Sequence, residues 1–245
     1  MSLARDGFVV FDADPRVTDW AKAAGRAATR LAREPVIRAQ NMRHGDTWFV
    51  GVDALPNGPE GEVGGVALRG PWQDHVAPVP LHTGQLSIIY PGYPKRDPDQ
   101  SEANHRYRIT RAAAHVDGLL PEGRARRRFA REFHAYILGL PLNPSGAAPT
   151  VVWPGSHVIM QAALAEAIGG RPIAEVDLTE AYHAARRAVF DNCDPIPIHA
   201  APGQSFLIHR FALHGTAPWQ GPVGPGRMIA FFRPEFSNPN DWLNA

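Results

Sequence analysis

The chain has 245 residues, of which 44% are hydrophobic and 20% charged, and this composition predicts one domain, residues 1–245, with a substantial buried core. The formal net charge is only +1, so no overall field favours nucleic acid or an anionic membrane surface, and we expect a small-molecule partner. No apolar run has the length of a membrane helix and acidic residues interrupt the first one, so we expect no membrane span, no signal peptide and a cytoplasmic protein.

Cys193 is the only cysteine, which excludes an intramolecular disulfide and any cluster of thiolates around a metal. A metal ion in this chain must therefore be held by imidazole and carboxylate groups. The 24 prolines and 23 glycines are spread along the whole sequence, as expected for many short strands joined by tight turns.

The N-terminal part predicts a strand followed by a long helix. Residues 6–11 (DGFVVF) have the composition of a strand, and Asp14 followed by Pro15 is typical of a helix start. Apolar residues then recur at helical spacing over residues 15–33, which predicts an amphipathic helix that packs on a sheet. A further strand is expected at 47–55, and the Gly- and Pro-rich segment 56–80, to which no element is assigned, is expected to be the most mobile part of the chain.

The remainder of the chain is mostly β in character. Two helices are expected, one capped by Ser156 that runs to about Ile168 and is ended by Gly169 and Gly170, and one over 179–190 with Asp177 and Glu180 in capping-box register. Strands are expected at 84–93, 107–117, 133–142, 149–155, 196–200, 204–215 and 227–236. The fold class predicted from these elements is mainly β with flanking helices.

The sequence contains two H-x-D triplets, His44-Gly45-Asp46 and His115-Val116-Asp117. The second ends the alternating segment 107–117, so its histidine and aspartate are expected on one face of a strand, roughly 7 Å apart along the chain. Both side chains can then bind the same metal ion.

A second histidine would complete a facial triad, the two-histidine, one-carboxylate site that leaves open positions on iron(II) for a chelating cosubstrate and O2. His214 is the candidate, because it ends an apolar strand just before Gly215 and therefore belongs at a barrel mouth. His209 lies an odd number of residues away and is expected on the opposite face, so we interpret it as a non-ligand.

An arginine follows at a suitable position. Arg227 begins the strand 227–236, and its guanidinium is expected to bind the far carboxylate of 2-oxoglutarate through two hydrogen bonds. Arg233 faces the same side of that strand but lies near its other end, and we expect it to form a salt bridge instead.

These features resemble the phytanoyl-CoA dioxygenase superfamily. The segments DGFVVF, QLSIIYPGY, HVD, VVWPGSH and APGQSFLIHRFALHGTAPW follow one another in the order typical of that family, with Arg227 after them, so the resemblance runs from about residue 6 to 236. It implies a jelly-roll core (a double-stranded β-helix of the cupin type) and an iron(II)- and 2-oxoglutarate-dependent oxygenase. Carried over by position, it makes His115, Asp117 and His214 the metal ligands and Arg227 the cosubstrate arginine, while His157 is structural.

The resemblance leaves other cosubstrate contacts open. On the strand after the ligand pair, either His134 or Tyr136 occupies the position of a pocket-facing side chain, and the Tyr136 hydroxyl can donate to a carboxylate. On the strand before it, Gln85 and Ser87 alternate with apolar residues, and Gln85 is a candidate contact. Trp219 stands where the family often has asparagine, so the wall of the pocket is expected to differ.

A basic run, residues 123–131, follows the ligand pair. It predicts either a solvated surface or a rim for an anionic substrate, because it leaves the metal end of the barrel.

The expected activity is oxidation of a small metabolite, with hydroxylation foremost, that consumes 2-oxoglutarate and O2 and releases succinate and CO2. The carboxylate of Asp117 disfavours halogenation, which requires that position to be open for chloride. Two alternatives remain: a catalytically silent jelly-roll binding protein, and a cupin-like metalloenzyme that does not use 2-oxoglutarate. Cupins typically carry an H-x-H motif, and the chain has none. The sequence carries no signal of oligomeric state.

Overall fold

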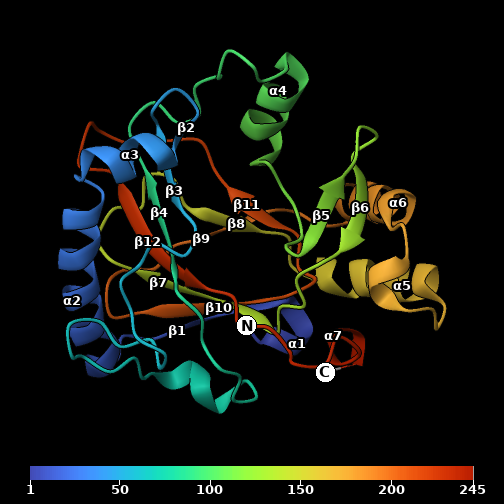
Figure 1. The fold of residues 1–245 in the computed structure, drawn as a ribbon, viewed down its shortest axis with the longest axis horizontal. Helices are drawn as coiled ribbons and strands as arrows, with labels where there is room; N and C mark the ends of the chain where they lie inside the picture. The colour runs from blue at the N-terminus through green and yellow to red at the C-terminus, as the bar shows by residue number, and fades with distance from the viewer. Residues whose placement is uncertain (245) are drawn as a thin grey trace.

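The computed structural model describes residues 1–244 as two main antiparallel sheets and a separate two-stranded hairpin, with helices around them (Figure 1). The larger sheet has seven strands in the order β1-β10-β7-β12-β4-β3-β2, and the smaller sheet has three in the order β11-β8-β9. The bounds in the larger sheet are β1 Phe8–Phe11, β10 Ser205–His209, β7 Tyr136–Pro141, β12 Arg227–Phe232, β4 Gln85–Ile89, β3 Trp48–Gly51 and β2 Met42–Arg43. Those in the smaller sheet are β11 His214–Thr216, β8 Thr150–Val152 and β9 Ile196–Ile198.

A hydrophobic cluster joins the two sheets. Val152 and Ile198 of the smaller sheet share it with side chains from β1, β7, β10 and β12 of the larger sheet. Since side chains alternate between the faces of a strand, these apolar residues mark the inner face of each strand. The members from the larger sheet are Phe8, Ile137, Phe206, Ile208, Ile229 and Phe231.

Helix α2 (Pro15–Leu31) covers the outer face of the larger sheet, as the helical spacing predicted. Asp14 caps its first turn by accepting a hydrogen bond from the backbone N–H of Arg16 at 2.8 Å. Trp20, on the buried face of this helix, is fully buried and donates its indole N–H to the carbonyl of Gly61 at 2.7 Å. This bond fastens the irregular segment 56–80, which contains the 3₁₀ helix η1 (Pro71–Asp74), to the core.

A second core lies beside the smaller sheet. Helices α5 (Ser156–Ile168) and α6 (Thr179–Asn192) pack there against each other and flank the hairpin of β5 (Leu119–Glu122) and β6 (Arg127–Ala130) (Figure 1). Short helices α1 (Leu3–Asp6) and α7 (Asp241–Asn244) lie near the two ends of the chain, η2 (Ile173–Glu175) joins α5 to α6, and α3 (Pro35–Asn41) precedes β2.

One predicted strand is wrong. Residues 107–117 do not form a strand, because helix α4 (Glu102–Arg111) occupies the first half of that segment. Ser101 caps this helix through the backbone N–H of Asn104 at 3.2 Å, and the left-handed conformations of Ala112 and Ala113 end it. The helix is solvent-exposed, so the apolar alternation that indicated a strand does not correspond to a buried face.

Other differences concern boundaries and the basic run. The single strand expected at 204–215 is two strands, β10 and β11, in different sheets, because residues 210–213 turn the chain between them. The basic run forms the hairpin β5–β6. The predicted fold class, mainly β with flanking helices on a jelly-roll core, is confirmed. Within residues 1–244, none of the helices combines the length and apolar character needed to cross a membrane.

Candidate metal centre

His115 and His214, far apart in the sequence, are held together by their own backbones. They form an isolated β-bridge in which the N–H of His115 donates to the carbonyl of His214 at 2.8 Å, and the N–H of His214 donates back at 3.0 Å. Their rings lie 4.7 Å apart, centre to centre. Gly215 permits this approach, since a Cβ atom there would lie 2.2 Å from the carbonyl oxygen of Ala112.

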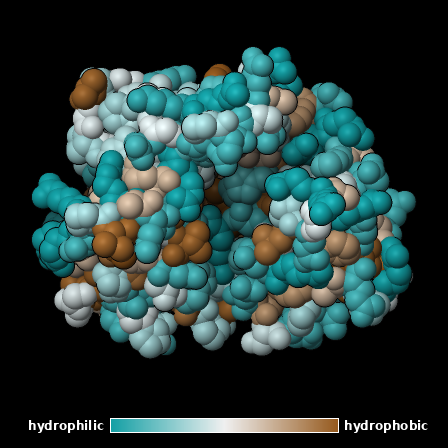
Figure 2. Space-filling model, turned by 45° about the horizontal axis from the view of Figure 1, so that its top comes forward, coloured by the Kyte–Doolittle hydropathy of each residue, from teal (hydrophilic) through white to brown (hydrophobic). Residues whose placement is uncertain are grey.

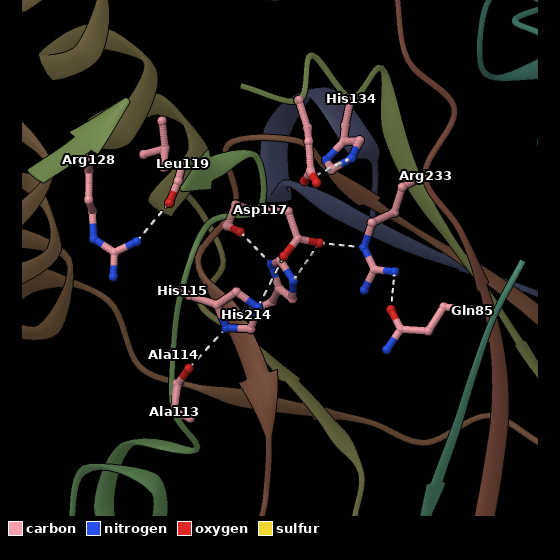
Figure 3. A network of polar contacts seen from close by, with 12 residues as sticks. Gln85, Ala113, Ala114, His115, Asp117, Leu119, Arg128, His134, His214 and Arg233 are labelled. Atoms are coloured by element: carbon pink, nitrogen blue, oxygen red, sulfur yellow. Dashed lines mark hydrogen bonds and ion pairs between the residues drawn. The ribbon is translucent and has the colours of Figure 1, made fainter. Parts of the chain in front are cut away.

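The carboxylate of Asp117 completes the cluster (Figure 3). Its Oδ1 lies 3.1 Å from Nε2 of His115, and its Oδ2 lies 3.5 Å from Nε2 of His214. One ligand atom from each of the three residues falls within 4.8 Å of the others, as binding to a common ion requires.

Both histidines already use their other ring nitrogen. Nδ1 of His115 lies 2.9 Å from the carbonyl oxygen of Ala113, and Nδ1 of His214 lies 3.0 Å from that of Ala212. A carbonyl can only accept, so Nδ1 carries the proton and Nε2 is left with a free lone pair. This is the arrangement that orients histidines on a metal.

Arg233 pairs with the carboxylate of the cluster. Its Nε donates to Oδ2 of Asp117 at 2.5 Å, and its Nη1 donates to Oε1 of Gln85 at 2.5 Å (Figure 3). Burial alone would raise the pKa of Asp117, but Arg233 and His214 outweigh burial and hold this pKa well below its usual value. The expected salt bridge of Arg233 is thus made with Asp117, and Gln85 supports the arginine.

The cluster opens into a cavity of about 610 Å³. Trp48, Ser87, Thr150 and Phe231 line it together with the three residues of the cluster, so both sheets contribute to its walls. Figure 2 shows the molecule hollowed near the middle of one face, with hydrophilic residues inside the hollow. The hydroxyl of Thr150 is buried and has no hydrogen-bond partner among residues 1–244. Nothing in the sequence singles out this threonine, because it is recognisable only once β8 faces the cavity.

Arg227 lies inside the barrel, but in a different cavity. Only 2% of its surface is exposed, and its Nε donates to the carbonyl of Ala148 at 2.8 Å. Nη1 and Nη2 have no partner within the described part of the chain, and burial lowers the pKa of Arg227 to about 10, so it stays charged at neutral pH. It lines a cavity of about 270 Å³ with Ile229 and Phe206, whereas Phe231, on the same face of β12, lines the cavity of the cluster.

Tyr136 does not lie near the cluster. It belongs to the core under α2 and lines a separate cavity beside Trp72 and Leu81. Its neighbour Ile137 faces the cluster instead, so strand alternation turns Tyr136 to the opposite face. Of the two candidates near the start of β7, the structure brings His134 into the cavity; burial lowers the pKa of His134 to about 4, and its Nδ1 has no partner within residues 1–244.

His157 and His209, which the sequence predicts to be non-ligands, lie away from the cluster. Nε2 of His157 lies 2.9 Å from the carbonyl oxygen of Ala4, and its ring packs against that of His209 with the centres 4.9 Å apart. Neither lines the cavity of the cluster.

Comparison with known proteins shows a likeness in fold. No protein family and no curated protein matches the sequence. Among solved structures, AviO1 from Streptomyces viridochromogenes is similar with a TM-score of 0.52 and 14% identity, over 97% of this chain and 93% of that one. SnoK, a non-haem α-ketoglutarate-dependent carbocyclase from nogalamycin biosynthesis, is similar with a TM-score of 0.50 and 14% identity, over 94% of this chain and 79% of that one.

EctD from S. alaskensis, solved with 2-oxoglutarate and 5-hydroxyectoine, has a TM-score of 0.47 and 17% identity over 97% of this chain and 75% of that one. At these identities the likeness concerns the fold. The chain therefore has a jelly-roll fold like that of a non-haem, 2-oxoglutarate-dependent enzyme, and it carries a His-Asp-His cluster inside that fold.

Proposed function

We propose that this protein is an iron(II)- and 2-oxoglutarate-dependent oxygenase that oxidises a small molecule, with hydroxylation as the expected outcome. The observation that carries the proposal is the convergence of His115, Asp117 and His214, each with one ligand atom within 4.8 Å of the others. The proposal includes two further points from the sequence. The motifs indicate membership of the phytanoyl-CoA dioxygenase superfamily, and the expected location is cytoplasmic.

The donor set fits ferrous iron. Two neutral imidazoles and one carboxylate form the facial triad of non-haem iron(II) oxygenases, which leaves further positions on the metal for a cosubstrate and oxygen. The low pKa of Asp117 keeps its carboxylate ionised, and the Nδ1 contacts of both histidines direct their Nε2 lone pairs toward the same point. A carboxylate at this position favours hydroxylation or a related oxidation over halogenation.

The interior of the barrel also fits a dicarboxylate. Arg227 offers two buried NH2 groups, Nη1 and Nη2, without partners, and a buried unpaired guanidinium is costly unless a ligand completes it. Arg227 pairs with Ile89 of β4, and Ile89 pairs with Trp48 of β3, which lines the cavity of the cluster. We therefore assign Arg227 to the far carboxylate of 2-oxoglutarate, with the Thr150 hydroxyl as a second donor.

When bound, iron with 2-oxoglutarate and O2 would supply the oxidising power through oxidative decarboxylation, with succinate and CO2 as products. The residues of this chain would position and protect that chemistry. Arg233 holds the Asp117 carboxylate in place through Nε, while Ile137 and Phe231 provide apolar walls that exclude water.

Binding of N-oxalylglycine, an unreactive mimic of 2-oxoglutarate, tests this function. Under anaerobic conditions the iron-loaded protein should bind one equivalent, and Arg227→Met should weaken binding while iron stays bound. A silent jelly-roll protein would bind neither iron nor the mimic, and a cupin-like enzyme that does not use 2-oxoglutarate would bind metal alone. Either result would overturn the proposal.

A further inference from the structure

A second, smaller cavity borders the metal centre at His115. It measures about 210 Å³ and is lined by residues of α4, β6 and α6 together with His115 itself. Three arginines face it, one from each element, and no acidic residue is among those that line it: Arg108, Arg128 and Arg186. His115 borders this cavity and the larger one, and 45% of its side chain is exposed, so a molecule bound in either cavity would lie beside this residue of the cluster.

Aromatic rings support the three guanidinium groups. Those of Arg128 and Arg186 lie 4.8 and 5.2 Å from the centre of the Tyr182 ring, so the two cations share one aromatic support. That of Arg108 lies 5.5 Å from the centre of the Trp48 ring. Stacking of this kind fixes the plane of a guanidinium and leaves its N–H edge free to bind an anion.

None of the three arginines is neutralised within the described chain. The side chain of Arg108 donates to the hydroxyl of Tyr93 at 2.9 Å, and that of Arg128 donates to the carbonyl of Leu119 at 2.8 Å. Neither partner carries a negative charge at neutral pH. The guanidinium of Arg186 stacks on the rings of Tyr107 and Tyr182, and no ion pair within residues 1–244 includes any of the three arginines.

The cavity also holds hydrogen-bond donors without partners. Tyr182 is 0% exposed, and its hydroxyl forms no hydrogen bond with any described residue. Nε of Arg108 is buried and equally unpaired. Because leaving buried donors unpaired is unfavourable, a bound acceptor explains why these two groups lie together.

The two cavities beside the metal differ in charge. Asp53, Glu132 and Glu235 lie around the larger one, where burial and the nearby Asp117 raise the pKa of Glu132. On the other side, burial and the nearby Arg186 lower the pKa of His183. Figure 3 shows Arg128 on one side of the cluster and His134 and Arg233 on the other. The larger cavity thus has carboxylates beside Arg233, whereas the smaller one has only cationic charged groups in its lining and is the better site for a further anionic group.

We propose that Arg108, Arg128, Arg186 and the Tyr182 hydroxyl bind the phosphate group of a phosphorylated small-molecule substrate. This inference rests on the proposed oxygenase function, for which it names the substrate class. A phosphate carries close to two negative charges and three acceptor oxygens, which matches three guanidiniums and a hydroxyl better than the two oxygens of a carboxylate do. Held there, the phosphate orients the rest of the substrate past His115 toward the metal.

Calorimetric titration with inorganic phosphate tests the site. The protein is loaded with iron(II) and N-oxalylglycine so that Arg227 is occupied, and acetate serves as the comparison anion. We expect saturable binding of phosphate that is at least tenfold tighter than that of acetate. Tyr182→Phe and Arg186→Gln should each weaken phosphate binding about tenfold, the equivalent of one lost charge-assisted hydrogen bond. Equal affinity for acetate, or no saturable phosphate binding, would overturn the inference.

Arg187→Gln is the matched control, because this exposed neighbour on α6 carries the same charge but does not line the cavity. The Arg187→Gln variant should bind phosphate as the wild type does. An equal loss of phosphate affinity in Arg187→Gln and Arg186→Gln would mean that only the net charge of the protein matters, and would overturn the proposed site. Tyr182→Phe removes only an unpaired hydroxyl, so it should fold with undiminished thermal stability.

A parallel titration of the metal-free protein separates this inference from the proposed function. If phosphate binds with the expected response to Tyr182→Phe and Arg186→Gln while neither iron nor N-oxalylglycine binds, the anion site stands and the oxygenase fails. If iron and N-oxalylglycine bind but phosphate does not, the oxygenase stands and the phosphate site is refuted.

Discussion

The guanidinium of Arg233 donates from Nε to Oδ2 of Asp117 across 2.5 Å, so the carboxylate of the metal cluster is also half of an ion pair. A carboxylate has enough lone pairs to accept this bond and still bind a metal ion. Arg233, itself held by Gln85, therefore fixes the direction in which Asp117 presents its free oxygen.

Loss of this arginine should weaken metal binding although Arg233 is no ligand. For Arg233→Met we expect iron(II) affinity to fall about 10- to 100-fold, the usual effect of removing a residue that orients a ligand. Anaerobic metal titration measures it, with Arg69→Met as a control at an exposed arginine. Unchanged affinity in Arg233→Met would show that Asp117 is positioned without it.

Arg227 should favour ligand binding at the expense of stability. Two of its buried nitrogens have no partner, so Arg227→Met should leave the thermal stability of the ligand-free protein unchanged or raise it, by about 1 kcal/mol at most. The same substitution should weaken 2-oxoglutarate binding about 100-fold, because a paired guanidinium contributes about 2–3 kcal/mol. Thermal unfolding with and without 2-oxoglutarate measures both effects. A large loss of stability together with normal 2-oxoglutarate binding would make Arg227 purely structural.

Gly215 should be essential to the metal centre without binding the metal. In Gly215→Ala the new Cβ atom would meet the carbonyl oxygen of Ala112 at 2.2 Å and the backbone nitrogen of Ala114 at 3.3 Å, and backbone atoms cannot move aside cheaply. The bridge between His115 and His214 should open, so we expect iron affinity to fall at least tenfold and the melting temperature to fall as well. Gly224→Ala is the control, because nothing lies within 4 Å of that position. Full iron binding by Gly215→Ala would contradict this account of the bridge.

Stability should decline as the pH falls below about 7. Burial is the main cause that lowers the pKa of three histidines, to about 4 in His44 and His134 and about 3 in His209. Below pH 6.5 the unfolded chain binds protons at these positions that the folded chain does not, so the free energy of unfolding decreases with falling pH. Each such proton contributes a slope of up to about 1.4 kcal/mol per pH unit.

His209→Asn tests this linkage, since an amide oxygen can replace Nδ1 as the acceptor for the N–H of Phe211. Denaturant unfolding between pH 7.5 and 5 should show a slope smaller by about one proton than in the wild type. An identical slope would mean that His209 is protonated in the folded protein.

Much of the fold could be predicted from sequence because its signals are local. The helices near residues 15–33, 156–168 and 179–190 and most strands lie where periodicity placed them. Asp14 caps the first helix, but the expected caps of the other two are wrong, because Gly155 and Leu178 precede those helices and neither makes a side-chain cap bond. The strand predicted at 107–117 is wrong, because the apolar alternation in that segment is outweighed by two helix signals. Ser101 caps the first turn of the helix, and the left-handed conformation of Ala112 ends it. The pairing of His115 with Asp117 does not depend on a strand, since the β-bridge to His214 positions His115 instead.

The cluster His115, Asp117 and His214 came from motif spacing, but the surroundings of the cluster did not. Strand parity decides that Ile137 rather than Tyr136 faces the cavity, and the parity of β7 is fixed only by its pairing with β10 and β12. The ion pair between Arg233 and Asp117 forms because the C-terminal end of β12, which Arg233 follows, lies beside the cluster. Arg186 and Tyr182 approach His115 only through the packing of α6, which no local pattern in the sequence encodes.

Anaerobic equilibrium dialysis against iron(II) tests the central claim most directly, because it counts the ions that the protein binds. The wild type should bind one equivalent, while His115→Ala, Asp117→Ala and His214→Ala should each retain almost none under the same conditions and remain folded by circular dichroism. Stoichiometric iron in a folded Asp117→Ala or His214→Ala variant would contradict a metal centre built from these three side chains.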